Sequence, residues 1–342
     1  MTFLSLKGML VYGLSQILLN EHEGITSRFI NFSHADILSI ADEFEIPISR
    51  GTSTSEVFYV SAIPQLMFKD KYVRQSLTLS DVSDQVLNQL INQKSKLLNT
   101  DRNHKSCERD HKVVDNFVVS QLWDELKIET KRSGWVSFHL SVVGVNLWLK
   151  HLNTELSNLT NHFLDQPEKA PSNLSAPPLL DDPQVWQAQY THARCCSLIR
   201  LWNAQVDGPY QVRNDTDWVA RDMTANNSDR RRWEPPQSAS ARKSVIYALI
   251  TLLDLAESDL FWIPYRWPSK QYFLLLNAVI PLCQAFEQFL AIDLSGFGNV
   301  NILSETAVKC NFQVSFTLAL IVEKTLKVLL EGCLGVDAPI EL

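Results

Sequence analysis

Two kinds of hydrophobic periodicity alternate in the first 150 residues of the chain. Apolar residues recur at every third or fourth position in residues 4–19 and 82–98, which is the spacing of amphipathic helices. In three shorter segments apolar and polar residues alternate, which predicts strands at residues 56–62, 126–130 and 136–140. The last two strands flank Ser133 and Gly134. We therefore expect a small α/β domain in this part of the chain.

A proline-rich segment follows this domain and leads into a second periodic region. Residues 165–183 contain five prolines among 19 residues, a composition typical of linkers. The segment ends in Asp182 and Pro183, a capping acid followed by a first-turn proline, so a helix should begin there and run to about Trp202. Helical periodicity predicts further helices at residues 244–260, 270–290 and 314–333.

These elements predict the fold class and the domains. The fold class is α+β and mainly α, with a small α/β domain at residues 1–150, a linker at residues 151–183 and an α-helical bundle at residues 184–342. A chain of 342 residues is long enough for two domains, each with its own core. The composition, 45% apolar and 20% charged, is that of a folded globular protein.

Cysteine usage and hydropathy indicate the compartment. The six cysteines follow no regular spacing, and Cys195 and Cys196 are adjacent, which favours a reducing environment. Residues 1–20 lack the charged region and the long apolar region of a signal peptide. The longest apolar run, residues 273–286, is shorter than the roughly 20 residues needed to cross a bilayer. We expect a soluble, cytoplasmic protein that does not act at a membrane.

The charge distribution limits where a nucleic acid can bind. The formal net charge is −7, so the molecule as a whole does not attract a polyanion and any contact must be local. The densest cationic stretch consists of Arg230, Arg231 and Arg232 next to Trp233. Arginine planes stack on bases and bind phosphates, so this stretch is a candidate RNA-binding site. Acidic residues dilute its charge, and a solvated loop without RNA explains the stretch equally well.

No group of residues indicates catalysis or a metal site. His104, Cys107 and His111 have a spacing compatible with zinc, but they lack a fourth ligand and lie in a densely charged segment that resembles an exposed loop. The remaining histidines and carboxylates show no spacing that pairs a nucleophile with a base. We expect no catalytic residue, no metal and no cofactor.

Residues 190–200, YTHARCCSLIR, form the most specific motif of the chain. They resemble the opening helix of the DALR-type anticodon-binding domain of arginyl-tRNA synthetases, where Tyr-Ala-His-Ala-Arg-x-x-Ser-x-x-Arg is usual and Thr191 is the one departure. Residues 334–342, LGVDAPIEL, are similar to the Leu-Gly-Ile-x-Ala-Pro-x-x-Met terminus of those enzymes. In the preceding helix, Thr317 replaces the arginine of the usual Arg-Leu-x-Leu.

The first domain carries a second resemblance to the same family. Residues 132–141, RSGWVSFHLS, are similar to the Pro-Gly-Phe-Ile-Asn-Phe-x-Leu-Ser motif of the synthetases' additional amino-terminal domain, and residues 58–63, FYVSAI, resemble its Asp-Tyr-Gln-Ser-Asn-Ala segment. In a full synthetase the catalytic domain lies between the two pieces. Here residues 150–183 separate them, which is too short for an ATP-binding α/β domain, and no His-x-Gly-His sequence occurs. The resemblance thus implies a paralogue without the catalytic domain.

The resemblance implies that RNA is the ligand. Tyr190, His192, Arg194 and Arg200 would present a ring and cations to an anticodon stem-loop, while the first domain would hold the outer corner of a tRNA. Packing inside the bundle is the competing explanation, and it suits Tyr190 and Arg194 better because they share a helix face with Leu201. The expected partners are tRNA or another structured RNA, with a synthetase or another protein in trans.

Two other functions stay open. A protein–protein interaction scaffold would keep both folds and hold a protein in place of RNA. The acidic net charge, Thr317 and the aromatic stretch LFWIPYRWP at residues 260–268 favour this alternative. Arginine–tRNA ligase activity follows from domain homology alone, and the missing catalytic motifs argue against it.

Overall fold

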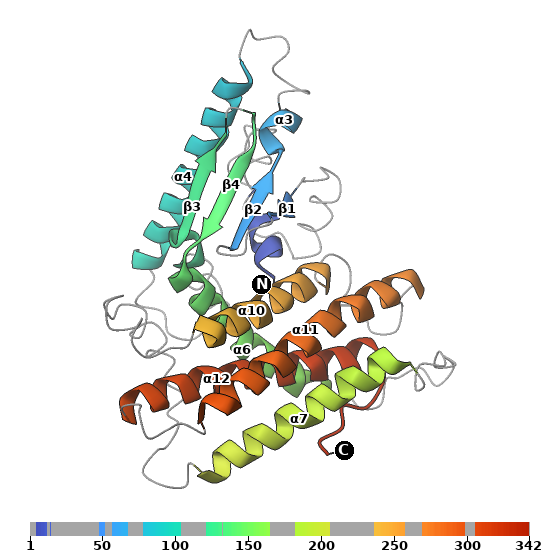
Figure 1. Cartoon of the computed structure of the whole chain (residues 1–342). Helices are drawn as coiled ribbons and strands as arrows, with labels where there is room; N and C mark the ends of the chain where they lie inside the picture. Colours follow the sequence, from blue (N-terminus) through green and yellow to red (C-terminus); the bar gives the residue numbers. More distant parts are fainter. Residues whose placement is uncertain are drawn as a thin grey trace. The chain divides into compact units, whose positions relative to one another are not determined.

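The computed structural model of the chain describes residues 5–11, 14, 48–51, 57–67, 78–103, 121–131, 133–164, 182–205, 236–256, 269–297 and 305–341. The chain divides into two compact units, Met1–Trp148 and Leu149–Leu342. Figure 1 labels the helices and strands of both units. The described part of the chain is mostly helical and has one antiparallel sheet near its amino terminus, which confirms the coarse fold class.

The first unit is built around a four-stranded sheet with the strand order β1-β2-β4-β3. All neighbouring strands are antiparallel, and they comprise β1 (Ile48–Arg50), β2 (Val57–Ser61), β3 (Leu126–Thr130) and β4 (Val136–Leu140). Every second residue of β2 is buried, namely Val57, Tyr59 and Ser61. The three strands predicted from alternation are therefore confirmed, and the three-residue edge strand β1 is an addition to the prediction.

The turn between β3 and β4 depends on Gly134. Its φ of 78° lies in the left-handed region that favours glycine. A Cβ at this position would also lie 2.7 Å from Cδ2 of Leu79. The turn closes where the backbone N–H of Lys131 donates to the carbonyl of Trp135 at 2.8 Å. The backbone angle therefore favours glycine here, and any larger residue would also displace the side chain of Leu79.

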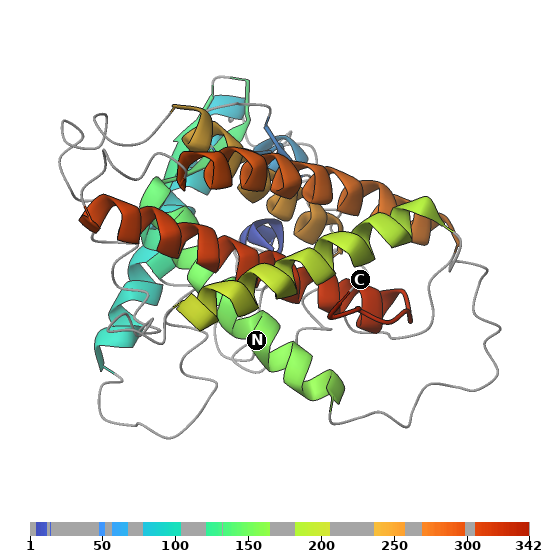
Figure 2. The same cartoon turned by 60° about the horizontal axis from the view of Figure 1, so that its bottom comes forward.

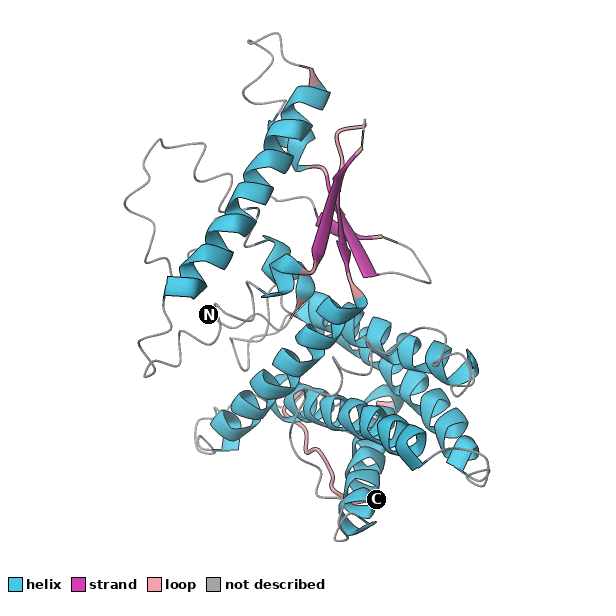
Figure 3. Cartoon of the chain, turned by 90° about the vertical axis from the view of Figure 1, so that its left-hand side faces the viewer, coloured by secondary structure: helices cyan, strands magenta, loops and turns pink. Residues whose placement is uncertain are grey.

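The first unit also contains helices α3 (Ile63–Met67) and α4 (Leu79–Asn103) and the helical residues 6–11 and 121–124. Figure 3 shows α4 alongside the sheet, and α4 contacts β3. The helix begins with a reciprocal cap, because the Asp81 carboxylate accepts from the Thr78 N–H at 2.7 Å and the Thr78 hydroxyl accepts from the Asp81 N–H at 3.2 Å. Val82, Val86 and Leu90 follow at helical spacing and are buried.

All secondary-structure elements described in the second unit are helices, and a non-helical stretch, residues 334–341, follows the last of them. After α6 (Val142–Leu164), which begins in the first unit, come α7 (Pro183–Gln205), α10 (Pro236–Ala256), α11 (Ser269–Phe297), α12 (Glu305–Lys327) and the π-helical turn η3 (Val328–Cys333). Helix α11 contacts α10 and α7, and α7 also contacts α12 and η3 (Figure 2). The hydrophobic core of the unit includes Leu249, Leu276, Phe286, Phe289 and Val322, all fully buried.

The predicted start of the linker is wrong. Residues 151–164, which we assigned to the linker, are the second half of α6. Leu152 and Leu156 lie one turn apart in this half, and both are fully buried. Its polar side contacts α12, where the Lys324 ammonium donates to Asn153 Oδ1 and Ser157 Oγ at 2.7 Å each. The proline-rich residues 165–181 lie outside the described part of the chain.

The start of α7 agrees with the sequence. Pro183 is its first residue, and the backbone N–H of Gln184 donates to Asp182 Oδ1 at 2.8 Å, as expected of a capping acid. The helix extends to Gln205, close to the predicted end at Trp202. The capping acid and the proline therefore set the first residue of α7, the helix that carries the YTHARCCSLIR motif.

The apolar segment of helix α11 is longer than residues 273–286, the longest apolar run identified in the sequence. Residues Phe273–Ile292 are long and apolar enough to span a bilayer, with a mean hydropathy of 1.5. More than half of the segment, 56%, is buried inside the protein. Core helices of soluble proteins meet the same criterion, so the segment is weak support for a membrane protein.

Candidate functional site

Helix α7 has an inner face and an outer face. Ala188, Thr191, His192 and Cys195 recur at helical spacing and are buried. The outer face carries Trp186 and Leu201, which are 60% and 53% exposed. Leu201, which the packing explanation placed on the same face as Tyr190 and Arg194, is therefore exposed, while Tyr190 and Arg194 are partly buried.

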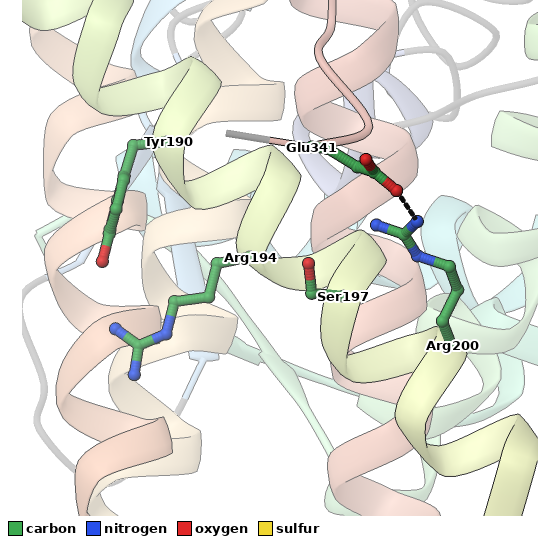
Figure 4. Close-up of a pocket in the computed structure, with 5 residues that line it drawn as sticks. All are labelled: Tyr190, Arg194, Ser197, Arg200 and Glu341. Carbon is green, nitrogen blue, oxygen red and sulfur yellow. Dashed lines mark hydrogen bonds and ion pairs between the residues drawn. The ribbon is translucent and has the colours of Figure 1, made fainter.

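The outer face borders an open groove (Figure 4). Its volume is about 600 Å³, and it is lined by Tyr190, Arg194, Ser197, Arg200 and Glu341. Trp186 lies one helical turn before Tyr190, and the two rings stack with centroids 5.5 Å apart and planes inclined by 21°. The helix thus presents an aromatic pair followed by two guanidinium groups along one side.

Arg194 is anchored across two helices. Its guanidinium forms an ion pair with Glu287 of α11, and both side chains are partly exposed. Burial raises the pKa of Glu287, while the charge and hydrogen bond of Arg194 act in the opposite direction. This contact between α7 and α11 is the internal role that the sequence suggested for Arg194.

Arg200 binds the last described residues of the chain. Its guanidinium lies 2.6 Å from Glu341 Oε1 and donates to the carbonyl of Ile340 at 2.8 Å. The side chains of Arg200 and Glu341 are 48% and 76% exposed. Exposed ion pairs contribute about 0–1 kcal/mol, so a stronger anionic ligand can displace Glu341.

Residues 334–341, which we call the carboxyl segment, run along α7. Gln189 Nε2 donates to the carbonyl of Asp337 at 2.9 Å. His192 Nδ1 lies 2.8 Å from the carbonyl of Pro339, which can only accept, so Nδ1 donates. Together with the contacts of Arg200, these bonds join the two motifs on which the family resemblance rests.

His192 is a structural residue in this arrangement. Its side chain is 2% exposed, and Nε2 lies 3.4 Å from Glu323 Oε1 of α12. Burial alone would lower the pKa of His192, but interactions with Cys196, Glu323 and Pro339 outweigh it and raise the pKa to about 9. A side chain buried in this way leaves no surface for RNA, so we remove His192 from the set of RNA-contacting candidates.

No family model, curated protein or solved structure matches the chain. The features of the chain that bear on its function are the two motifs joined at the carboxyl segment and the groove beside α7.

The structure brings three of the predicted site residues together. Tyr190, Arg194 and Arg200 line the same groove, with His192 turned inward. Arg230, Arg231, Arg232 and Trp233 lie outside the described residues, as does the aromatic stretch at residues 260–268. Thr317, where the family pattern has arginine, is a half-buried residue of α12.

Sequence reasoning missed Trp186 and Glu341. The spacing of Trp186, Tyr190 and Arg194, each four residues from the next, places them on one helix face and was the available signal for Trp186. Nothing comparable pointed to Glu341, because its contact with Arg200 joins positions 141 residues apart. The groove as observed can stack a planar ring and bind an anion.

Proposed function

We propose that the chain is a non-catalytic paralogue of arginyl-tRNA synthetase that binds tRNA or another structured RNA, by itself or with a synthetase in trans. The observation that carries the proposal is the exposed Trp186 stacked on Tyr190, next to a groove that contains Arg194 and Arg200. Aromatic rings followed by guanidinium groups are the elements with which proteins bind unpaired nucleotides.

The contact between the two motifs supports the resemblance. In the proposal, the second unit is a helical bundle of the synthetase anticodon-binding type. The histidine of the first motif, His192, donates to Pro339 of the second, and Arg200 binds Ile340 and Glu341. Residues that define the resemblance in the sequence are thus partners in space, as expected if they preserve one inherited arrangement.

The overall acidity of the chain is compatible with such a site. With a formal net charge of −7, binding must depend on short-range contacts in the groove. Stacking on an aromatic side chain contributes about 1–3 kcal/mol per base and does not require a basic surface. The aromatic pair is therefore expected to provide most of the affinity, with the arginines adding phosphate contacts.

A protein–protein interaction scaffold is the second candidate. Both arginines of the groove already pair with carboxylates, Arg194 with Glu287 and Arg200 with Glu341. Exposed Trp186 and Leu201 on the same helix are also suited to a protein interface.

The first test measures RNA binding by the full chain after removal of the aromatic pair. Fluorescence anisotropy with bulk tRNA and with an arginine tRNA transcript should show that Trp186→Ala combined with Tyr190→Ala raises the dissociation constant at least about tenfold. Phe273→Ala is the matched control, because Phe273 is 58% exposed on α11 and does not line the groove. It should leave the affinity unchanged.

Two results would count against RNA binding. One is the absence of salt-dependent binding to any tRNA by the unmodified chain. The other is an equal affinity of the double variant and the unmodified chain. Retention of a protein partner by the unmodified chain, with loss of that partner in the double variant, would then favour the scaffold.

A further inference from the structure

A second group of reactive side chains lies behind the groove. His192 and Cys196 are one turn apart on α7, and Glu323 faces them from α12. The imidazole nitrogen, the thiol sulfur and the carboxylate oxygen all lie within 4.8 Å of one another. Imidazole, thiolate and carboxylate are the three side-chain ligands that zinc uses most often in proteins.

The imidazole is already oriented as a ligand. Nδ1 donates to the carbonyl of Pro339 at 2.8 Å, which directs Nε2 toward Glu323. Histidines that bind metals usually hold the ring in this way, with the second ring N–H donating to a carbonyl or a carboxylate. The carbonyl of Pro339 in the carboxyl segment therefore holds the His192 ring in the orientation needed for a metal ligand.

The separations between donor atoms are close to those of a tetrahedral zinc site. Zinc bonds to nitrogen and oxygen of about 2.0 Å and to sulfur of about 2.3 Å place nitrogen and oxygen about 3.3 Å apart and nitrogen and sulfur about 3.5 Å apart. The observed distances from Nε2 are 3.4 Å to Glu323 Oε1 and 3.9 Å to Cys196 Sγ. Sγ lies equally far from Nδ1, so the Cys196 side chain must turn toward Nε2 for binding.

The surroundings favour a cation between these atoms. The Glu323 carboxylate and the Cys196 sulfur both face the His192 ring, so a carboxylate and a thiol that can ionise lie beside Nε2. A divalent ion bound by one thiolate and one carboxylate would be neutralised by its ligands. Cys196 and Glu323 are partly exposed, so solvent reaches two of the three ligands.

We infer that His192, Cys196 and Glu323 bind a zinc ion, with water as the fourth ligand. The ion ties α7 to α12 and, through the Nδ1 hydrogen bond, to the carboxyl segment. It stabilises the arrangement behind the groove and takes no part in RNA contact, so the inference goes beyond the proposed function and does not depend on it.

The test uses the metal-free full chain titrated with Co²⁺, which reports coordination by its absorption. One equivalent should bind with the visible bands of four-coordinate cobalt and a thiolate-to-cobalt band in the near ultraviolet, and zinc should displace it. Cys196→Ser should lose the thiolate band. Glu323→Gln should keep this band and weaken binding at least about tenfold. Cys333→Ser, which changes a cysteine outside the group, should behave like the unmodified chain.

Circular dichroism of each variant separates loss of the ligand from loss of the fold. A folded Cys196→Ser variant that keeps the thiolate band would place the metal on another cysteine and overturn the inference. Failure of the folded, reduced, unmodified chain to bind cobalt or zinc would also overturn it, and His192 would then be a protonated bridge between Pro339 and Glu323.

Discussion

At the scale of single residues, His192 joins three parts of the second unit. One imidazole links α7 to α12 through Glu323 and to the carboxyl segment through Pro339. In the metal-free protein this link requires a proton on both ring nitrogens, since each nitrogen faces an acceptor. The strength of the link therefore depends on pH.

The direction of this dependence follows from the raised pKa. The pKa of His192 is about 9 in the folded chain, compared with 6.5 for an unperturbed histidine. The stabilisation is fully present below pH 6.5 and is lost as the pH rises through about 9. In the presence of a chelator, we expect the free energy of unfolding to fall by up to about 3 kcal/mol across this window in urea titrations.

Glu323→Gln provides the comparison for this prediction. It removes the carboxylate that favours the charged imidazole, so its stability should fall less over the same pH range. Parallel curves for the two proteins would show that other groups, such as cysteines, cause the dependence and that His192 does not.

The residues of the site were only partly predictable. The YTHARCCSLIR motif located the correct helix because the motif is local. Which side of the helix faces the interior depends on α11, α12 and the carboxyl segment, all distant in sequence, so the burial of His192 could not be read from spacing. The same limit applies to Cys196, whose neighbour Glu323 is 127 residues away.

At the scale of elements, the carboxyl segment occupies part of the groove that we assign to RNA. Glu341 binds Arg200 through a carboxylate in the way that a phosphate oxygen would. The segment therefore competes with an anionic ligand for Arg200. Because the Arg200–Glu341 ion pair is exposed and therefore weak, this competition lowers the affinity of the anionic ligand only slightly.

Removal of this competitor should strengthen RNA binding. Glu341→Gln breaks the ion pair of Arg200 and removes a negative charge from the groove, and we expect the affinity for tRNA to rise about two- to fivefold at low salt. Glu331→Gln is the matched control, since Glu331 lies in η3 and does not line the groove. Equal gains in both variants would indicate a general effect of net charge and would remove Glu341 from the site.

The elements themselves were predictable where the pattern was local. Alternation located β2, β3 and β4, and the Asp182-Pro183 pair located the start of α7. Strand β1 has three residues, too few to show a period. Helix α6 was not predicted, although Trp148, Leu152 and Leu156 repeat at four-residue spacing, because its second half was assigned to the linker that ends in the proline-rich stretch.

At the scale of the whole molecule, the boundary between the two units falls inside α6. The second unit begins at Leu149, so it includes the buried Leu152 and Leu156 and the two acceptors of Lys324. A boundary drawn at the proline-rich stretch would separate these residues from the unit to which they belong.

Two fragments test this assignment. A fragment of residues 142–342 should unfold at a higher temperature than one of residues 183–342, because the shorter fragment loses two buried leucines worth about 1.5–3 kcal/mol each. Differential scanning calorimetry of both fragments gives the comparison. Equal transition temperatures would show that the second unit does not need α6.

The π-helical turn η3 makes the path of the carboxyl segment depend on the number of residues before it. In η3 the N–H of Leu334 bonds to the carbonyl of Leu329, five residues back, and the N–H of Val336 reaches Leu330, six residues back. A π-turn holds one residue more than an α-turn. Deletion of one residue from Val328–Cys333 would restore α-helical spacing and rotate everything after it by about 100°. Pro339 and Glu341 would then point away from α7, so we expect a change in the length of η3 to break the contacts of the carboxyl segment.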